Sequence, residues 1–305
     1  PEALPRSVPF MSQHGDLVLA CDARIDNRDE LVHILRLGEC PADQITDGEL
    51  ILAAYEQWGE HCPEKLLGDF AFAIWHERKQ ILFAARDHFG IRPFFYYHSP
   101  YTLIFASEIK ALLCLTDVPR RLNEVRIADY LLPMGEDRVS TLYDGIVRLP
   151  PAHILIARNG AVSTRRYWSP EPSQGLQIHL DAEWCEAYRE IFTEAVRCRL
   201  RRSSPIGFLL SGGLDSSSVV CVARSLLARD NGEKMLTLSG IYDEARGSDE
   251  RSFVNVITSQ DGVEAHYGHP DQLSPLSDWD SMTPHEDEPL WNPQMALRWS
   301  LYPLA

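Results

Sequence analysis

The sequence lacks the features that define several large classes of protein. It has no run of Lys and Arg longer than a pair such as Arg120-Arg121, and its 305 residues carry a formal net charge of −15. Binding along the phosphate backbone of a nucleic acid requires clustered basic residues, so we expect no nucleic-acid partner. No window has the length and apolar content of a membrane span or a secretory signal, which predicts a cytoplasmic protein without a membrane partner.

Cysteine is present but follows no recognisable pattern. The seven cysteines are odd in number and include no C-x-x-C pair, so the sequence indicates neither a disulfide framework nor a zinc site. Cys21 lies within an apolar run, where a buried structural thiol is favoured over a nucleophile. The chain starts with Pro-Glu-Ala-Leu and stops within an apolar helical pattern, so we expect it to be truncated at both ends.

The first half of the chain alternates short strands with helices. Residues 69–77 and 80–87 predict one hairpin, and residues 93–99 and 102–108 predict a second. Residues 28–38 and 47–59 have helical spacing, with Gly38 and Gly59 at the C-caps and Asp47 placed to cap the second helix. We therefore expect residues 1–170 to form an α+β domain with a mainly antiparallel sheet.

A stretch rich in Pro and polar residues, 167–177, predicts the boundary to a second domain at 178–305. Beyond it comes an amphipathic helix over 181–200. Strands at 206–210, 235–242 and 264–268 then alternate with helices at 216–228 and 249–260. This alternation predicts an α/β domain with a parallel sheet, whose ligands bind at the carboxyl ends of the strands.

The turn after the first of these strands has the composition of an anion site. Gly212 and Gly213 allow main-chain N–H groups to approach a ligand, and the hydroxyls of Ser211, Ser216 and Ser217 can add donors. Asp215 would be repelled by a polyphosphate unless Mg²⁺ lay between them, so it is a candidate metal ligand. The alternatives are that Asp215 only caps the helix and that the glycines only make a tight turn.

The turn matches neither common phosphate loop. It lacks the Lys of the Walker A motif and the third Gly of the dinucleotide fingerprint. The hexapeptide S-G-G-L-D-S resembles instead the PP-loop of ATP pyrophosphatases, which cleave ATP between the α and β phosphates and attach AMP to a substrate oxygen.

Nearly the whole chain resembles the asparagine synthetase family. The resemblance is carried by 206-IGFLLSGGLDSS-217 in the second half and by 68-GDFAFAIWHERKQILFAARDHFGIRPFFYY-97 and 105-FASEIKAL-112 in the first. It implies an Ntn-type, class II glutamine amidotransferase-like domain followed by an adenine-nucleotide domain, both truncated. The nucleophilic Cys and the later synthetase residues of the family would lie outside this chain, so no catalytic residue is assigned.

The resemblance also implies roles for individual residues. Asp215 would bind Mg²⁺, and Asp47 would stand at the position of a glutamine-binding acid. The residues implied in ATP binding are Leu210, Ser211, Gly212, Gly213, Asp215, Ser216 and Ser217 around the phosphates, with Ser239 and Gly240 beside the adenine.

One departure from the family pattern leaves the function open. Cys21-Asp22-Ala23 stands where the family's glutamine pocket has N-G-E, and an altered pocket resembles those of β-lactam synthetases and lasso-peptide cyclases. The first hypothesis is an ATP-dependent asparagine synthase that uses aspartate and glutamine. The second is a ligase that closes a cyclic amide, in which an internal amine attacks a small-molecule or peptide carboxylate. The third is a non-catalytic scaffold module, and a homodimer is compatible with all three.

Overall fold

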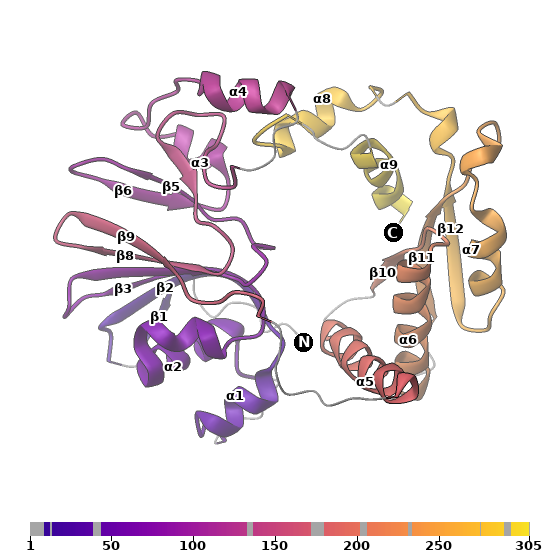
Figure 1. The fold of residues 1–305 in the computed structure, drawn as a ribbon, viewed down its shortest axis with the longest axis horizontal. Coiled ribbons are helices and arrows are strands. Elements are labelled where there is room, and N and C mark those ends of the chain that lie inside the picture. Colours follow the sequence, from indigo (N-terminus) through magenta and orange to yellow (C-terminus); the bar gives the residue numbers. More distant parts are fainter. Residues whose placement is uncertain are drawn as a thin grey trace. The chain divides into compact units, whose positions relative to one another are not determined.

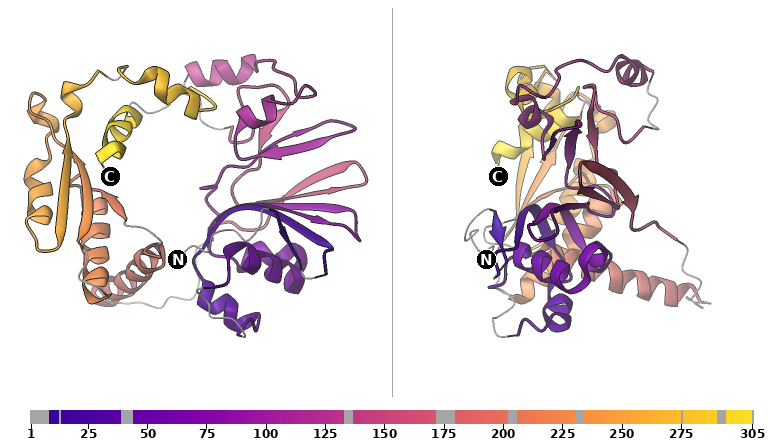
Figure 2. Two further views of the ribbon diagram at one scale, coloured as in Figure 1. Left: turned by 180° about the vertical axis from the view of Figure 1, so that it is seen from behind. Right: turned by 90° about the vertical axis from the view of Figure 1, so that its left-hand side faces the viewer.

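The computed structural model describes residues 9–12, 14–38, 44–132, 137–171, 180–201, 206–230, 234–274, 276–289 and 294–304. The chain divides into two compact units, residues 2–174 and residues 175–305 (Figure 1, Figure 2). The boundary expected between 170 and 178 falls largely on residues outside the described ranges, and it stays a prediction.

The first unit contains two antiparallel sheets. Among its described residues, one sheet has six strands in the order β1-β2-β3-β4-β8-β9, and the other has three in the order β6-β5-β7. The strands are β1 (Phe10–Met11), β2 (Leu17–Ile25), β3 (Gly68–His76), β4 (Ile81–Arg86), β5 (Phe95–His98), β6 (Leu103–Ala106), β7 (Ile146–Arg148), β8 (His153–Arg158) and β9 (Ala161–Arg166). Both expected hairpins and the α+β class are confirmed.

The helices of the first unit are α1 (Arg28–Ile34), α2 (Asp47–Trp58), α3 (Ile109–Leu113) and α4 (Glu124–Leu131). Two of the expected caps are wrong. Helix α1 ends at a C-cap at Leu35, before Gly38 is reached. The N-cap of α2 is Thr46 rather than Asp47, because the Thr46 hydroxyl accepts the Glu49 N–H at 3.2 Å while the Glu49 carboxylate accepts the Thr46 N–H. This reciprocal pair is a capping box.

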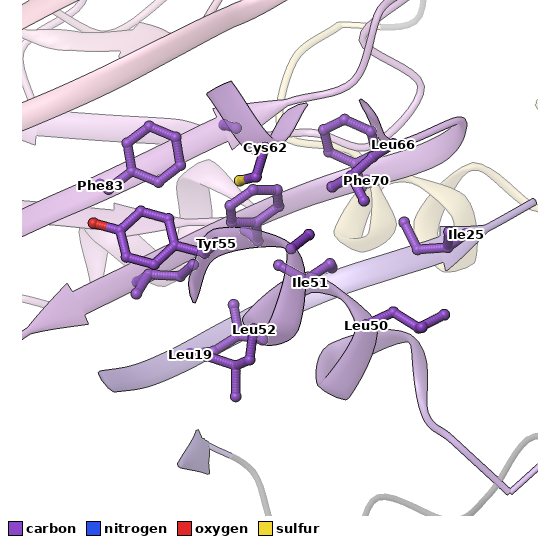
Figure 3. Packing of buried hydrophobic residues seen from close by; sticks show 14 of the residues in the cluster. Leu19, Ile25, Leu50, Ile51, Leu52, Tyr55, Cys62, Leu66, Phe70 and Phe83 are labelled. Atoms are coloured by element: carbon purple, nitrogen blue, oxygen red, sulfur yellow. The ribbon is translucent and has the colours of Figure 1, made fainter. Parts of the chain in front are cut away.

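The core of the first unit lies where α2 packs against the six-stranded sheet. Figure 3 shows Ile51 and Tyr55 of α2 beside Leu19 of β2 and Phe83 of β4. These side chains are all less than a tenth exposed. Full burial of each such aliphatic or aromatic side chain is worth about 1.5–3 kcal/mol, so this contact holds the helix on the sheet.

The second unit is built around a parallel sheet. Its described elements are α5 (Asp181–Arg199), β10 (Gly207–Leu209), α6 (Leu214–Asp230), β11 (Met235–Gly240), α7 (Arg251–Thr258), β12 (Val263–Gly268), α8 (Trp279–Met282) and α9 (Gln294–Leu301). Within these residues the strand order is β10-β11-β12, with Leu209 opposite Leu238 and Leu238 opposite His266. The expected α/β class and parallel pairing are confirmed.

Helix α5 forms over the expected residues, but only one end of its apolar stripe is covered within its unit. Val196 is 7% exposed and packs with Phe192 and Leu200 in the core under the sheet. Trp184 and Tyr188, nearer the start of the helix, are 49% and 68% exposed. The amphipathic pattern predicted the helix and did not reveal which part of the stripe its neighbours cover.

Candidate functional site

The serine- and glycine-rich turn lies at the carboxyl end of β10, directly before α6. The Leu210 N–H donates to the Leu238 carbonyl of β11 at 2.9 Å, which continues the parallel ladder up to the turn. The loop from Leu210 to Ser217 therefore lies beside the end of β11, where Ser239 and Gly240 stand. The sheet thus brings all the candidate ATP-binding residues to one edge.

Hydrogen bonds among its own side chains and backbone close the turn. The Ser211 and Ser216 hydroxyls lie 3.0 Å apart, and the Ser211 N–H donates to the Ser216 Oγ at 3.2 Å. The Ser216 hydroxyl also donates to the Gly213 carbonyl at 3.3 Å. These hydrogen bonds hold the loop against the first turn of α6, and none of them involves a charged side chain.

The first turn of α6 offers main-chain donors at this edge. The Ser217 N–H donates to the Gly213 carbonyl at 3.1 Å. The preceding N–H groups, those of Leu214, Asp215 and Ser216, have no helical carbonyl ahead of them. Because α6 begins at Leu214, Asp215 is a first-turn residue and not the N-cap. Its exposed carboxylate is free to face a ligand or a cation.

Gly212 adopts a conformation and a position that suit glycine alone. Its φ is +89°, in the left-handed region that L side chains rarely adopt. A Cβ built on it would lie 3.1 Å from the Glu250 carbonyl oxygen and 3.2 Å from the Phe253 Cβ. The loop therefore rests against the start of α7, a contact that sequence reasoning missed because it joins separate segments of the chain.

The end of β11 carries a buried hydroxyl beside the loop. Ser239 is 1% exposed, and its Oγ has no hydrogen-bond partner among the described residues. Such groups are uncommon, since an unsatisfied buried polar atom costs about 1–3 kcal/mol. A Cβ on the adjacent Gly240 would lie 3.0 Å from the Leu297 Cδ1, so α9 approaches this strand end closely.

The segment after β11 is held by a network of charged side chains. Asp249 accepts the Tyr242 N–H at 3.2 Å, and Arg251 donates to the Asp243 carboxylate at 2.7 Å. His269 also contacts that carboxylate, with its Nδ1 at 2.8 Å. The hydrogen bond from Arg251, followed by that from His269, lowers the pKa of Asp243. Asp249 therefore has a structural task in this loop.

The described residues contain neither a metal-ligand cluster nor a membrane-spanning helix. No group of three or more His, Cys, Asp or Glu side chains among them could hold a metal ion. None of the described helices has the length and apolar content needed to cross a membrane.

In the first unit, Asp47 is engaged with a neighbouring cation. Arg28 is 8% exposed and forms an ion pair with the Asp47 carboxylate. Its other terminal nitrogen donates to the carbonyl of Ile45. Because Thr46 caps the helix, the Asp47 side chain is available for this pair.

The segment Cys21-Asp22-Ala23 lies in β2. Burial, followed by the charges of Asp47 and Asp22, raises the pKa of the Cys21 thiol to about 12. A thiol with such a pKa is almost fully protonated near neutral pH and is a poor nucleophile. The Asp22 carboxylate lies 3.5 Å from the guanidinium of Arg92.

Arg92 is placed by a turn that Asp87 organises. Asp87 is 1% exposed and accepts the N–H groups of Phe89, Ile91 and Arg92 at 2.9–3.1 Å. Arg86 donates to the carbonyls of Gly90, Arg92 and Leu149, each at 2.7 Å. The side chains of Arg86 and Asp87 therefore fix this turn.

Two known families match the chain, one on each side of the division between the two structural units at residues 174 and 175. Residues 6–168 match a family described as a glutamine amidotransferase domain. Residues 187–305 match a family described as asparagine synthase. The two matches follow the two structural units, so each unit has its own family counterpart.

Individual relatives agree with these matches. Asparagine synthetase [glutamine-hydrolyzing] 3 of Bacillus subtilis is 32% identical over 222 residues, which are 72% of this chain and 35% of that protein. Amidase chry2 of Gibberella zeae is 30% identical over 258 residues, 80% of this chain and 38% of that protein. The chain thus spans little more than a third of the length of these relatives. A glutamine PRPP amidotransferase structure from B. subtilis aligns over 85% of this chain and 62% of its own, with 13% identity and a TM-score of 0.35.

Proposed function

Because the chain belongs to the family that joins a glutamine amidotransferase domain to an asparagine synthase domain, we propose that its second unit binds ATP with Mg²⁺. The bound nucleotide serves an amide-forming ligase that activates a carboxylate by adenylation. The observation that carries the proposal is the juxtaposition of the Leu210–Ser217 loop with the end of β11. Ser211, Ser216 and the first-turn N–H groups of α6 meet there at the carboxyl edge of a parallel sheet.

The residues at this edge fit an adenine nucleotide. The left-handed Gly212 and the N–H groups of the first turn of α6 would bind phosphate oxygens. The exposed carboxylate of Asp215 would hold Mg²⁺ beside those phosphates, where the remaining ligands are phosphate oxygens and water. The backbone of Gly240, next to the buried Ser239 at the end of β11, would lie beside the base.

Each of these groups has a defined task in the proposed reaction. ATP supplies the AMP group that makes the substrate carboxylate reactive. The backbone donors of the loop stabilise charge that develops on the leaving phosphates, and they need little reorganisation because their own hydrogen bonds already fix the loop. The nitrogen that attacks comes either from glutamine, as in the asparagine synthetases among the relatives, or from an amine of the substrate.

The direct test is Mg·ATP binding to this chain, measured by calorimetry. Asp215→Ala should weaken Mg·ATP binding by about tenfold or more, because a charged ligand to the metal is lost. The same substitution should change ATP binding in EDTA much less. Asp261→Ala, which removes an exposed acid at the amino end of β12, is the matched control and should bind normally. Absence of ATP binding to the full-length protein would leave only the scaffold hypothesis.

A second candidate function, a ligase that does not use glutamine, is supported by the ion pair of Asp22 with Arg92. These two side chains neutralise each other where a glutamine pocket of the family has groups for a substrate ammonium and carboxylate. Aspartate-dependent pyrophosphate release by the full-length protein, with and without glutamine, separates the two candidates. Stimulation by glutamine would support an asparagine synthase, and no aspartate dependence would exclude it.

A further inference from the structure

The proposed nucleotide loop, residues 210–217, rests on the first turn of α7 at a single glycine. Gly212 leaves no room for a side chain, because a Cβ on it would lie 3.1 Å from the Glu250 carbonyl oxygen and 3.2 Å from the Cβ of Phe253. The same carbonyl accepts the N–H groups of Phe253 and Val254, at 2.9 and 3.1 Å, so it belongs to the first hydrogen-bonded turn of the helix. A shift of this turn would therefore move the surface that Gly212 contacts.

Arg251, the first residue of α7, connects this turn to the segment that follows β11. Its guanidinium donates to the Asp243 carboxylate at 2.7 Å and to the Tyr242 carbonyl at 3.4 Å. Its Nε lies 3.4 Å from the carboxylate of Asp249, which accepts the Tyr242 N–H at 3.2 Å. One side chain thus meets three acceptors. A planar guanidinium with several fixed N–H groups suits such a set better than the compact ammonium of a Lys.

The second carboxylate oxygen of Asp243 extends this connection to the segment that follows β12. It lies 2.8 Å from the Nδ1 of His269 and accepts a hydrogen bond from the Gln272 amide at 3.3 Å. Asp271 of the same segment accepts the Glu244 N–H at 2.7 Å. The segments after β11 and β12 are therefore joined to each other, and the first turn of α7 joins them to the loop after β10.

The contacts of Arg251 act on this edge of the sheet rather than on the whole fold. The side chains of Arg251 and Asp243 are 37% and 42% exposed, and an ion pair so accessible to water adds little to the free energy of unfolding. Val254 and Ile257 hold the body of α7 in the core of the unit. Phe253 is 61% exposed, so apolar packing contributes less where Gly212 makes its contact. The hydrogen bonds of Arg251 fix the helix start there instead.

We propose that Arg251 is a positioning residue for the nucleotide loop. It holds the first turn of α7 where Gly212 rests against it, and it thereby fixes the N–H groups of the loop around the phosphates. The Arg251 side chain does not itself bind the nucleotide. This inference rests on the proposed function for the identity of the ligand, whereas the link between Arg251 and the loop can be measured without any ligand.

The first measurement is amide hydrogen exchange of the full-length protein without nucleotide. It reports how firmly the loop is held, because the N–H groups of Ser211 and Ser217 are hydrogen-bonded within it. Arg251→Gln should speed their exchange by about threefold or more, since loss of a charge-assisted hydrogen bond changes a local equilibrium by such a factor. The urea midpoint should stay close to that of the unaltered protein. Arg189→Gln removes an exposed ion pair with Glu186 within α5, changes the charge equally and should alter neither quantity.

The second measurement is Mg·ATP binding to the full-length protein by calorimetry. Arg251→Gln should weaken binding by about fivefold or more, because the loop donors lose their fixed positions. Arg251→Lys keeps the charge without the planar fork and should weaken binding less. Arg189→Gln should bind Mg·ATP like the unaltered protein.

The two measurements separate this inference from the proposed function. Unchanged exchange of the loop in Arg251→Gln, or normal Mg·ATP binding by that variant, would overturn the inference. A large fall in the urea midpoint would do the same, because it would show that Arg251 supports the whole unit. Lack of Mg·ATP binding by the unaltered protein would refute the proposed function instead, and the exchange of the loop would still decide whether Arg251 positions it.

Discussion

The carboxylate of Asp22 and the guanidinium of Arg92 face each other at 3.5 Å, one from strand β2 and the other from the turn after β4. Each side chain is about two fifths exposed, so the pair contributes little to stability by itself. Its significance is spatial, because it joins the Cys21-Asp22-Ala23 segment of β2 to a turn whose N–H groups Asp87 binds. The predictions below concern this region and the nucleotide loop.

Cys21 should resist alkylation. Its thiol pKa is raised to about 12, so the reactive thiolate is scarce at pH 7 and increases only as the pH rises toward that value. Iodoacetamide labelling followed by mass spectrometry of the peptides should show the exposed Cys185 modified well before Cys21. Rapid labelling of Cys21 at pH 7 would revive it as a candidate nucleophile.

Asp47 should matter for stability whether or not it binds glutamine. Asp47→Ala leaves the buried Arg28 without its carboxylate, and breaking a buried pair costs about 3–5 kcal/mol. Urea unfolding would measure the loss. Asp144→Ala, which removes the half-buried partner of the exposed Arg121, is the comparison and should cost less than about 1 kcal/mol. A small effect for both variants would contradict a structural role for Asp47.

Asp87 should be among the most sensitive polar positions of the first unit. Asp87→Ala leaves the N–H groups of the turn without their acceptor, with an expected loss of about 3 kcal/mol or more in the free energy of unfolding. Asp87→Asn keeps one carbonyl oxygen and should lose less. If the two substitutions had equal effects, the charge rather than the count of accepted hydrogen bonds would decide the stability.

Gly212 should be required for nucleotide binding. Gly212→Ala combines the cost of a left-handed conformation, of order 1 kcal/mol, with a contact to the Glu250 backbone that forces the loop to shift. Gly262 has a similar φ of +81°, but a Cβ there would meet no atom within 4 Å. Gly262→Ala therefore pays the conformational cost alone and should bind Mg·ATP normally. Normal binding by Gly212→Ala would show that the loop does not approach the phosphates.

The sequence predicted the elements that depend on neighbouring residues. The two hairpins, the parallel strands and the helix after Ser211-Gly212-Gly213 all follow from local periodicity and turn residues, and the structure confirms them. The N-cap residue of α2 could not be predicted from the sequence, because Thr46 and Asp47 are adjacent and both are good cap residues. Only the structure shows that the Asp47 carboxylate forms an ion pair with Arg28.

Contacts between distant segments were beyond the reach of pattern reasoning. Asp22 meets Arg92 through the placement of a strand and a turn, and β4 pairs with β8, although no local signal in the sequence encodes that pairing. The same limit applies to the contact of Gly212 with the start of α7. In each case the residue types were visible in the sequence and their partners were not.

Thr46 and Asp47 have separate roles at the start of α2. If a single acid supplied both the cap and the charge, one substitution would remove both. Here the cap is carried by Thr46 and Glu49, and the ion pair by Asp47 and Arg28. A substitution at position 47 would therefore break the ion pair and leave the cap of α2 intact, so the helix start and the placement of Arg28 can be perturbed separately.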